Sequence, residues 1–225
     1  NFLKHTSEII LSRVNIEGIC QESFEQAKCV LDNTLSLLGD DKDVFDIVTF
    51  LSNHTDYLYA HTLGVSLYAV MISMKMGWKS PRTLYPLALG GLFHDIGMKG
   101  IDPEILTRPK IQLASNEIKL LETHPHRGVD FLKCQPSIAQ NILYIVLQHH
   151  ENCMGTGYPQ KLTKAQIYPL ALLVGLADDF CHLAIKNPNS EGMDPKQVIK
   201  RMSVLKDKYD EEMFAALKEM LHECS

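Results

Sequence analysis

Apolar residues recur at steps of three and four along almost all of the 225-residue chain. One such series is formed by Phe24, Ala27, Val30, Leu31, Leu35 and Leu38. This spacing places apolar side chains on one face of an α-helix, whereas a half-buried strand needs strict alternation of apolar and polar residues. No alternating stretch of convincing length and no internal repeat is found. The sequence therefore predicts an all-α fold.

Glycines, prolines and polar clusters divide this pattern into helices. Helices are expected at about residues 55–76, 81–96, 115–132, 137–150, 163–185, 195–206 and 209–221. Loops are expected at 101–114, which carries two prolines, and around 155–159 and at 186–195, which combine glycine, proline and polar residues. Residues 1–54 also show helical spacing, and we interpret them as an accessory region in front of a main domain at 55–225.

The charge balance excludes some classes of partner. There are 22 Lys and Arg residues against 27 Asp and Glu, a net charge of −5, whereas a binder of nucleic-acid polymers or anionic membranes needs a cationic surface. The longest nearly apolar run, Tyr168 to Ala177, is about half of the roughly 20 residues that a membrane helix requires. Six cysteines without a C-x-x-C pair, and no signal-peptide pattern, favour reduced thiols and a cytoplasmic location.

The chain has ten histidines, and five of them fall with two aspartates on predicted helix faces or at predicted helix ends. These seven residues are His61, His94, Asp95, His124, His149, His150 and Asp178. Each admits a plainer interpretation when taken alone. His61 has the position of a hydrogen-bonded core histidine, His94–Asp95 that of a charge pair at a helix end, and His149–His150 that of a surface pair beside a helix C-terminus.

The two aspartates favour a metal site. Asp95 and Asp178 each follow an apolar helical run, and burying a carboxylate is costly unless it is paired or binds a metal. Imidazole and carboxylate ligands together suit Fe, Mn, Zn or Ni better than Mg or Ca. Seven ligands exceed the three or four that hold one catalytic ion. The sequence therefore predicts two divalent ions that share one carboxylate.

Four motifs resemble the HD-GYP branch of the HD phosphohydrolases. They are His94-Asp95 within HDIGMKGI, His124-Pro125 with Gly128, the HHE of 149–151, and Gly155-x-Gly157-Tyr158-Pro159. Their order and spacing match the family over roughly residues 55–205. The resemblance implies a multi-helix bundle around a central binuclear metal site. It also implies hydrolysis of cyclic di-GMP, a bacterial second messenger used in signalling, to linear pGpG or onward to GMP.

The resemblance assigns roles to the seven residues. Asp95 bridges two ions, of which iron is the first choice and Mn, Zn and Ni are alternatives. One ion is completed by His61, His94 and Asp178, the other by His124, His149 and His150. A water that bridges the ions loses its proton and attacks phosphorus in line with the leaving ribose oxygen.

The chain departs from the family pattern near the substrate. Tyr57 stands where some members carry a glutamate that allows a third metal, so two metals are expected. Met98 replaces a lysine. Lys99 is the substitute expected to act in catalysis and to bind phosphate if the backbone turns at Gly97, and otherwise it is a solvated lysine. From Asp178 on, the chain reads DDFCHLAIKNPNSEGM, without the family's RPY-type segment, and leaves Lys186 as the nearby cation. Further substrate contacts are expected from Arg108 and from Tyr158.

These departures leave more than one function open. The first is a phosphodiesterase for cyclic di-GMP, with weak activity if the phosphate contacts are lost. The second is a signalling module that binds a cyclic dinucleotide, or a protein partner through the GYP loop, and hydrolyses little. The third is a phosphohydrolase for a different nucleotide.

Overall fold

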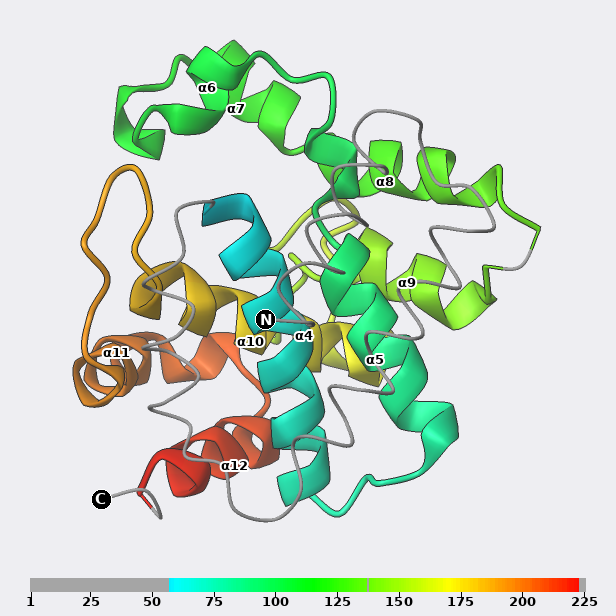
Figure 1. Ribbon diagram of the computed structural model, residues 1–225, viewed down its shortest axis with the longest axis vertical. Coiled ribbons are helices and arrows are strands. Elements are labelled where there is room, and N and C mark those ends of the chain that lie inside the picture. The colour runs from blue at the N-terminus through cyan, green and yellow to red at the C-terminus, as the bar shows by residue number, and fades with distance from the viewer. Residues whose placement is uncertain (1–56, 137, 223–225) are drawn as a thin grey trace, which may run out of the picture.

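The computed structural model describes residues 57–136 and 138–222, and this part of the chain is all-helical, as predicted. The expected accessory region at 1–54 lies outside the described residues. Three helices form the centre: α4 (Tyr57–Lys75), α5 (Pro81–Phe93) and α10 (Pro169–Ala184). Helix α4 packs against both α5 and α10, and α9 (Gln140–Gln148) packs against α5 (Figure 1).

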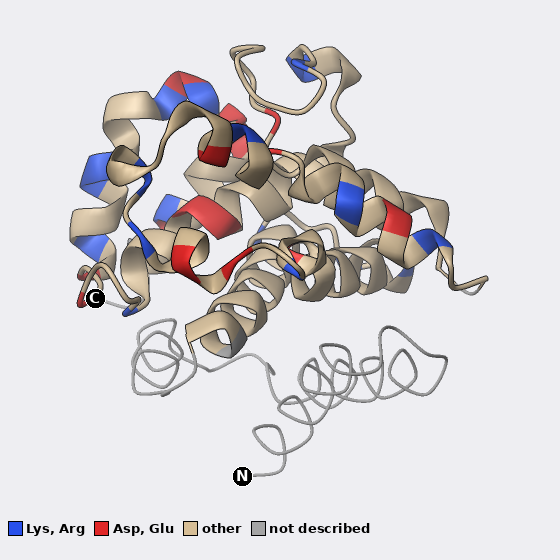
Figure 2. Cartoon of the chain, turned by 90° about the horizontal axis from the view of Figure 1, so that it is seen from above, with Lys and Arg blue, Asp and Glu red and all other residues tan. Residues whose placement is uncertain are grey.

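The core helices are apolar on nearly all sides, which is typical of helices surrounded by protein. Helix α4 carries one Lys or Arg, Lys75, in its last turn, and α5 carries one, Arg82. Figure 2 shows charged residues mainly on the outer elements, with few on the central helices. Helices α11 (Pro195–Met202) and α12 (Glu211–His222) pack on α10, and α12 also packs on α4. The short helix η4 (Ser203–Lys208) connects these two.

The expected helix at 115–132 is wrong, because the chain forms two helices there. They are α7 (Ser115–Leu121) and α8 (His124–Lys133), separated by Glu122 and Thr123. Pro125 lies in the first turn of α8, where its missing N–H leaves no hydrogen bond unmade, so it suits the start of a new helix. The break makes His124 the first residue of α8.

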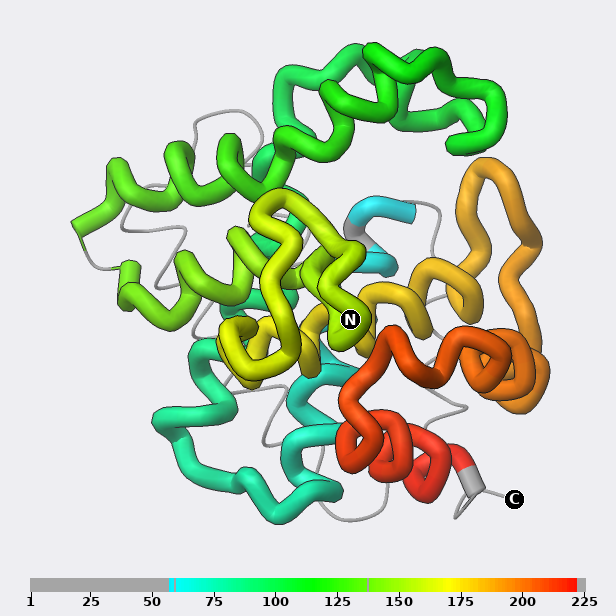
Figure 3. Tube along the Cα trace, turned by 180° about the vertical axis from the view of Figure 1, so that it is seen from behind, coloured from blue at the N-terminus to red at the C-terminus, as the bar shows by residue number. Residues whose placement is uncertain are grey.

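The expected loop at 101–114 also contains short helices, α6 (Pro103–Thr107) and η2 (Lys110–Gln112). The Asp102 side chain accepts a hydrogen bond from the amide of Glu104 and so caps α6. Together with α7 these elements form an arm that projects from the bundle in both Figure 1 and Figure 3. The expected helices at 81–96 and 163–185 are shorter than predicted. The first ends at Phe93, and the second begins at Pro169 after η3 (Lys164–Gln166).

Two glycines bring the helix ends together around one point. A Cβ atom on Gly97, in η1 (Ile96–Met98), would lie 1.9 Å from the carbonyl oxygen of His124. A Cβ atom on Gly175, in α10, would lie 2.3 Å from the carbonyl oxygen of His149. Any larger residue would push these backbones apart. Among the residues that the structure describes, no helix has the length and apolar character needed to cross a membrane.

Candidate metal centre

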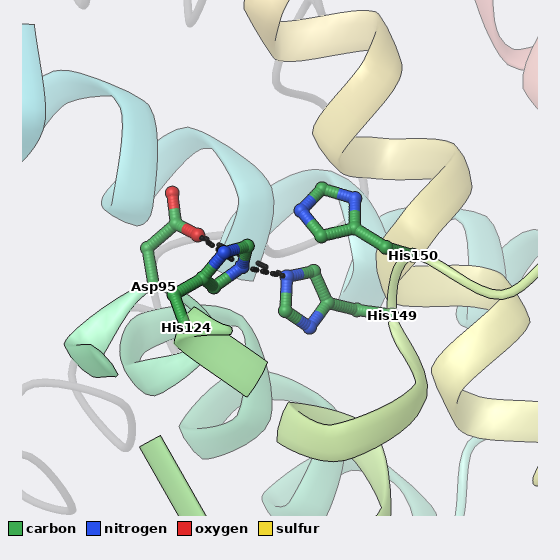
Figure 4. Close-up of side chains that lie close together, drawn as sticks. All are labelled: Asp95, His124, His149 and His150. Atoms are coloured by element: carbon green, nitrogen blue, oxygen red, sulfur yellow. Dashed lines mark hydrogen bonds and ion pairs between the residues drawn. The ribbon is translucent and has the colours of Figure 1, made fainter. Parts of the chain in front are cut away.

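The seven predicted residues converge in the middle of the bundle. His61 comes from α4 and Asp178 from α10, while the others lie at helix ends: His94 and Asp95 after α5, His124 at the start of α8, and His149 and His150 after α9. Figure 4 shows Asp95, His124, His149 and His150 pointing toward one another. His61, His94, His124, His149 and Asp178 are buried. Five separate elements therefore supply one polar cluster inside an apolar bundle.

The carboxylate of Asp95 lies between two groups of imidazoles. Its Oδ1 is 3.3 Å from Nε2 of His124 and 3.8 Å from Nε2 of His149. Its Oδ2 is 3.2 Å from Nε2 of His94 and 3.9 Å from Nε2 of His61. Ligand atoms that share an ion at about 2.1 Å lie roughly 3–4 Å apart, so these separations suit two ions on either side of one carboxylate.

Helix ends orient three of the imidazoles. The last carbonyls of a helix have no partner within it, and the Nδ1 of each of three histidines bonds to such a carbonyl three residues earlier. These bonds run from His94 to Gly91 (2.7 Å), from His124 to Leu121 (2.7 Å) and from His149 to Val146 (2.8 Å). A neutral imidazole that donates from Nδ1 presents the lone pair of Nε2 on its other side. All three Nε2 atoms thus face the cluster, where each can offer a lone pair to a bound ion.

Several polar atoms of the cluster are left without a partner. Nε2 of His124 and Nε2 of His149 are 3.1 Å apart, so two lone pairs face each other. Nε2 of His94, Oδ1 of Asp95 and Nδ1 of His61 are buried and have no hydrogen-bond partner among the described residues. Buried polar atoms are rarely left unpaired without an ion or water. The residues present therefore fit divalent cations.

The local field keeps the carboxylates ionised. Burial would raise the pKa of Asp95, but the neighbouring imidazoles, above all His94, hold it well below its usual range. His61, His94 and His150 likewise outweigh burial and lower the pKa of Asp178. Burial lowers the pKa of His150 to about 3 and that of His149 well below its ordinary value. These two imidazoles are therefore neutral, which is the form that binds metals.

Asp178 faces both groups of imidazoles. Its Oδ1 is 3.1 Å from Nε2 of His61 and 3.9 Å from Nε2 of His94. Its Oδ2 is 3.8 Å from Nδ1 of His150. The family resemblance assigns this residue to the first ion alone, whereas the structure gives it a second neighbour in the other group.

The predicted substrate contacts differ in where they lie. The ring of Tyr158 stacks on His150, with centroids 4.6 Å apart, and so lies against the cluster. Arg108 instead pairs with Glu117 at the start of α7, and Lys186 lies 2.6 Å from Glu191. Lys99 is half-buried directly after η1. Arg108 and Lys186 would have to leave their partners before binding a phosphate.

Two residues that were not expected to contribute, His182 and Glu151, also lie near the cluster. His182 lies one helical turn after Asp178, and its Nδ1 is 3.4 Å from the hydroxyl of Tyr57, whose ring packs 5.4 Å from His61. Spacing of four residues from Asp178 was the available signal. Glu151 is buried at 4% exposure beside His150. Its place in the HHE motif was a signal in the sequence, but residue spacing does not show which groups the carboxylate of Glu151 contacts.

Comparisons with known proteins agree with this geometry. A family model described as HD domain matches residues 47–213. A cyclic di-GMP phosphodiesterase of Pseudomonas aeruginosa is 30% identical over 167 residues, which are 74% of this chain and 40% of that protein. A 3'3'-cGAMP-specific phosphodiesterase of Vibrio cholerae is 28% identical over 189 residues, covering 81% of this chain and 40% of that protein. The chain thus spans about two fifths of the length of these curated relatives.

A solved structure shares the fold. An HDG"Y"P protein from Bdellovibrio bacteriovorus superposes with a TM-score of 0.79 at 20% sequence identity, over 98% of this chain and 69% of that one. At this level of identity the likeness concerns the arrangement of the helices.

Metal binding should depend on pH through His94. Burial would lower the pKa of His94, but the negative charges of Asp95 and Asp178 outweigh it and raise that pKa to about 9. At neutral pH the metal-free protein therefore holds a proton that an incoming ion must displace. The apparent affinity for Mn²⁺ should rise by about tenfold per pH unit from neutral pH to about pH 9.

Isothermal titration calorimetry in buffers of different ionisation enthalpy counts the protons released. His126→Gln changes an exposed histidine of α8 and should keep the same slope. An affinity that does not change across this pH range would contradict the charge state assigned to His94.

Proposed function

The chain belongs to the HD domain family, in its HD-GYP branch, and from this premise we propose that it is a metal-dependent phosphodiesterase that hydrolyses cyclic di-GMP. The products are linear pGpG, GMP or both. The ligands of two divalent ions are the seven clustered residues, with Asp95 between them. Imidazole and carboxylate ligands suit Fe, Mn, Zn or Ni, and the resemblance to the HD-GYP family makes iron the first choice for both ions.

One observation carries this proposal: each oxygen of Asp95 faces a different group of imidazoles. Two groups of ligands meet at this residue, one formed by His61, His94 and Asp95, the other by Asp95, His124, His149 and His150. Two ions held by these groups would supply Lewis-acid chemistry, which activates water and neutralises charge on phosphoryl oxygens.

The protein's own residues define how an anionic substrate is received. With Asp95 and Asp178 ionised and His149 and His150 neutral, two carboxylate charges face the single proton on His94, so the metal-free cluster repels a phosphodiester. Divalent ions reverse that sign, so substrate binding depends on metal binding. Tyr158 supports this assignment because its half-buried ring borders the cluster beside His150. It forms one wall of the substrate site.

The surroundings of this site complete the proposal. Residues 55–225 form the phosphohydrolase domain, and residues 1–54 form an accessory region in front of it. The free thiols of Cys134, Cys153 and Cys181 support a cytoplasmic location. The GYP loop also offers a surface for a protein partner. Lys99 contributes to phosphate binding and catalysis next to η1.

A second candidate is a module that binds a cyclic dinucleotide with little turnover. The observation that favours it concerns the cations. Met98 replaces the family's lysine, and Arg108 and Lys186 are held by Glu117 and Glu191. Each missing charge-assisted phosphate contact costs about 1.5–3 kcal/mol, so two lost contacts weaken binding by about two to four powers of ten. The related phosphodiesterase for 3'3'-cGAMP makes that dinucleotide the appropriate second substrate to assay.

Asp95→Asn tests the metal-dependent function. The amide removes the charge between the two groups of imidazoles, so we expect fewer than two ions per chain and a fall in kcat of at least about 10³-fold. Metal content is measured by elemental analysis, and turnover by chromatography of linear pGpG and GMP. Asp130→Asn, on an exposed position of α8, is the matched control and should keep both.

Two outcomes would contradict the proposed phosphodiesterase activity or the place of Asp95 in it. If Asp95→Asn retains both ions and full turnover, Asp95 is not the bridge. If the metal-loaded wild type binds cyclic di-GMP but yields no linear product at high enzyme concentration, the binding module is the correct function.

Met98→Lys tests the phosphate shell. Restoring a cation at this position should lower KM for cyclic di-GMP by about tenfold, because one charge-assisted contact is regained. Lys99→Met in the otherwise unchanged chain shows whether the neighbouring lysine already makes that contact, in which case KM rises. An unchanged KM in Met98→Lys means that the phosphate lies elsewhere.

A further inference from the structure

A buried acceptor group fastens the loop that follows the two adjacent histidines. Gln148, Glu151 and Asn152 flank His149 and His150, and their exposed fractions are 7%, 4% and 7%. Oε1 of Gln148 accepts a hydrogen bond from the amide of Tyr168, and Oδ1 of Asn152 accepts from the amides of Met154 and Thr156. The segment that carries two of the proposed metal ligands thus also anchors the loop at 153–168, which lies in the foreground of Figure 3.

Glu151 holds the part of this loop next to Tyr158. Its Oε1 accepts from the amide of Gln160 at 2.5 Å and from that of Lys161 at 3.1 Å. Its Oε2 accepts from the amide of Leu162 at 2.9 Å. A buried carboxylate is costly unless its charge is met, and three backbone N–H groups meet it here. Glu151 is therefore occupied by the loop and does not join the metal cluster.

The loop held by Glu151 lies directly on the ligand segment. The amide of Tyr158 donates to the carbonyl of His150 at 3.2 Å, and the two side chains stack with rings 28° apart. A Cβ atom on Gly157 would lie 2.5 Å from that same carbonyl oxygen. The backbone can approach this closely only at glycine. A shift of residues 160–162 would therefore pass to Tyr158 and to its contact with His150.

We propose that Glu151 is a positioning residue, which acts through the amides of residues 160–162 to hold Tyr158 against His150 as one wall of the metal centre. The inference rests on the proposed function only in naming a cyclic dinucleotide as the molecule that meets this wall. A large substrate has to contact Tyr158, whereas a small phosphodiester needs the metal centre alone. Loss of Glu151 should therefore weaken the use of a cyclic dinucleotide much more than the hydrolysis of a small phosphodiester.

Glu151→Gln is the sharpest variant because it keeps size and shape. One oxygen becomes an NH₂ group, which places a donor opposite backbone donors and leaves at least one amide without an acceptor. Glu219→Gln makes the same chemical change at an exposed position of α12, away from the loop that Glu151 holds, and serves as the control.

Two measurements on the metal-loaded proteins test the proposal. Hydrogen exchange of residues 158–163 should quicken at least about tenfold in Glu151→Gln and remain unchanged in Glu219→Gln. In steady-state assays, KM for cyclic di-GMP should rise about tenfold or more, while kcat/KM for bis(4-nitrophenyl) phosphate stays within about twofold. Metal content should stay at the wild-type value.

The opposite outcomes overturn the proposal. Unchanged exchange in the loop means that Glu151 does not hold it, and an equal loss on both substrates with reduced metal content means that Glu151 only supports the fold. If the wild type hydrolyses neither substrate, the proposed function fails, and hydrogen exchange still decides the role of Glu151. If Glu151→Gln does not fold, the wild type decides: unprotected amides at Gln160, Lys161 and Leu162 would refute the contacts on which the proposal depends.

Discussion

The structure depends on the position of one half-buried carboxylate, Asp95, at the centre of a group of imidazoles. Its two oxygens face different histidines, and one of these oxygens has no hydrogen-bond partner among the described residues. A charged oxygen that is buried without a partner costs several kcal/mol, which is comparable to the free energy of unfolding of a whole domain. Cations at this point would pair these atoms and connect the helices that carry them.

A helical bundle can orient imidazoles toward one point because the backbone carbonyls at helix ends have no partner within the helix. Carbonyls at three such ends accept hydrogen bonds from Nδ1 of His94, His124 and His149, and so direct each Nε2 inward. Glycines at 97 and 175 let the backbones of these segments approach one another. After α9, Glu151 in turn accepts hydrogen bonds from backbone amides of the loop that carries Tyr158.

Sequence patterns anticipated the cluster better than its surroundings. Asp95 and Asp178 were identifiable because each follows an apolar helical run, and the five histidines by their places on predicted helix faces and ends and in the family motifs. All seven lie together, although their role as ligands stays a prediction. The break at Glu122–Thr123 was missed, because helical spacing continues across it and only Pro125 marks it. The partners of Arg108 and Lys186, Glu117 and Glu191, are set by how the arm and the loop fold, which spacing does not encode.

Anomalous X-ray diffraction from crystals of protein purified without chelators would show directly whether Asp95 lies between two ions. Two peaks of anomalous density are expected inside the bundle, one on the Oδ1 side of Asp95 and one on the Oδ2 side. Absence of both peaks, or a single ion with Asp95 turned away from it, would mean that Asp95 does not hold two ions.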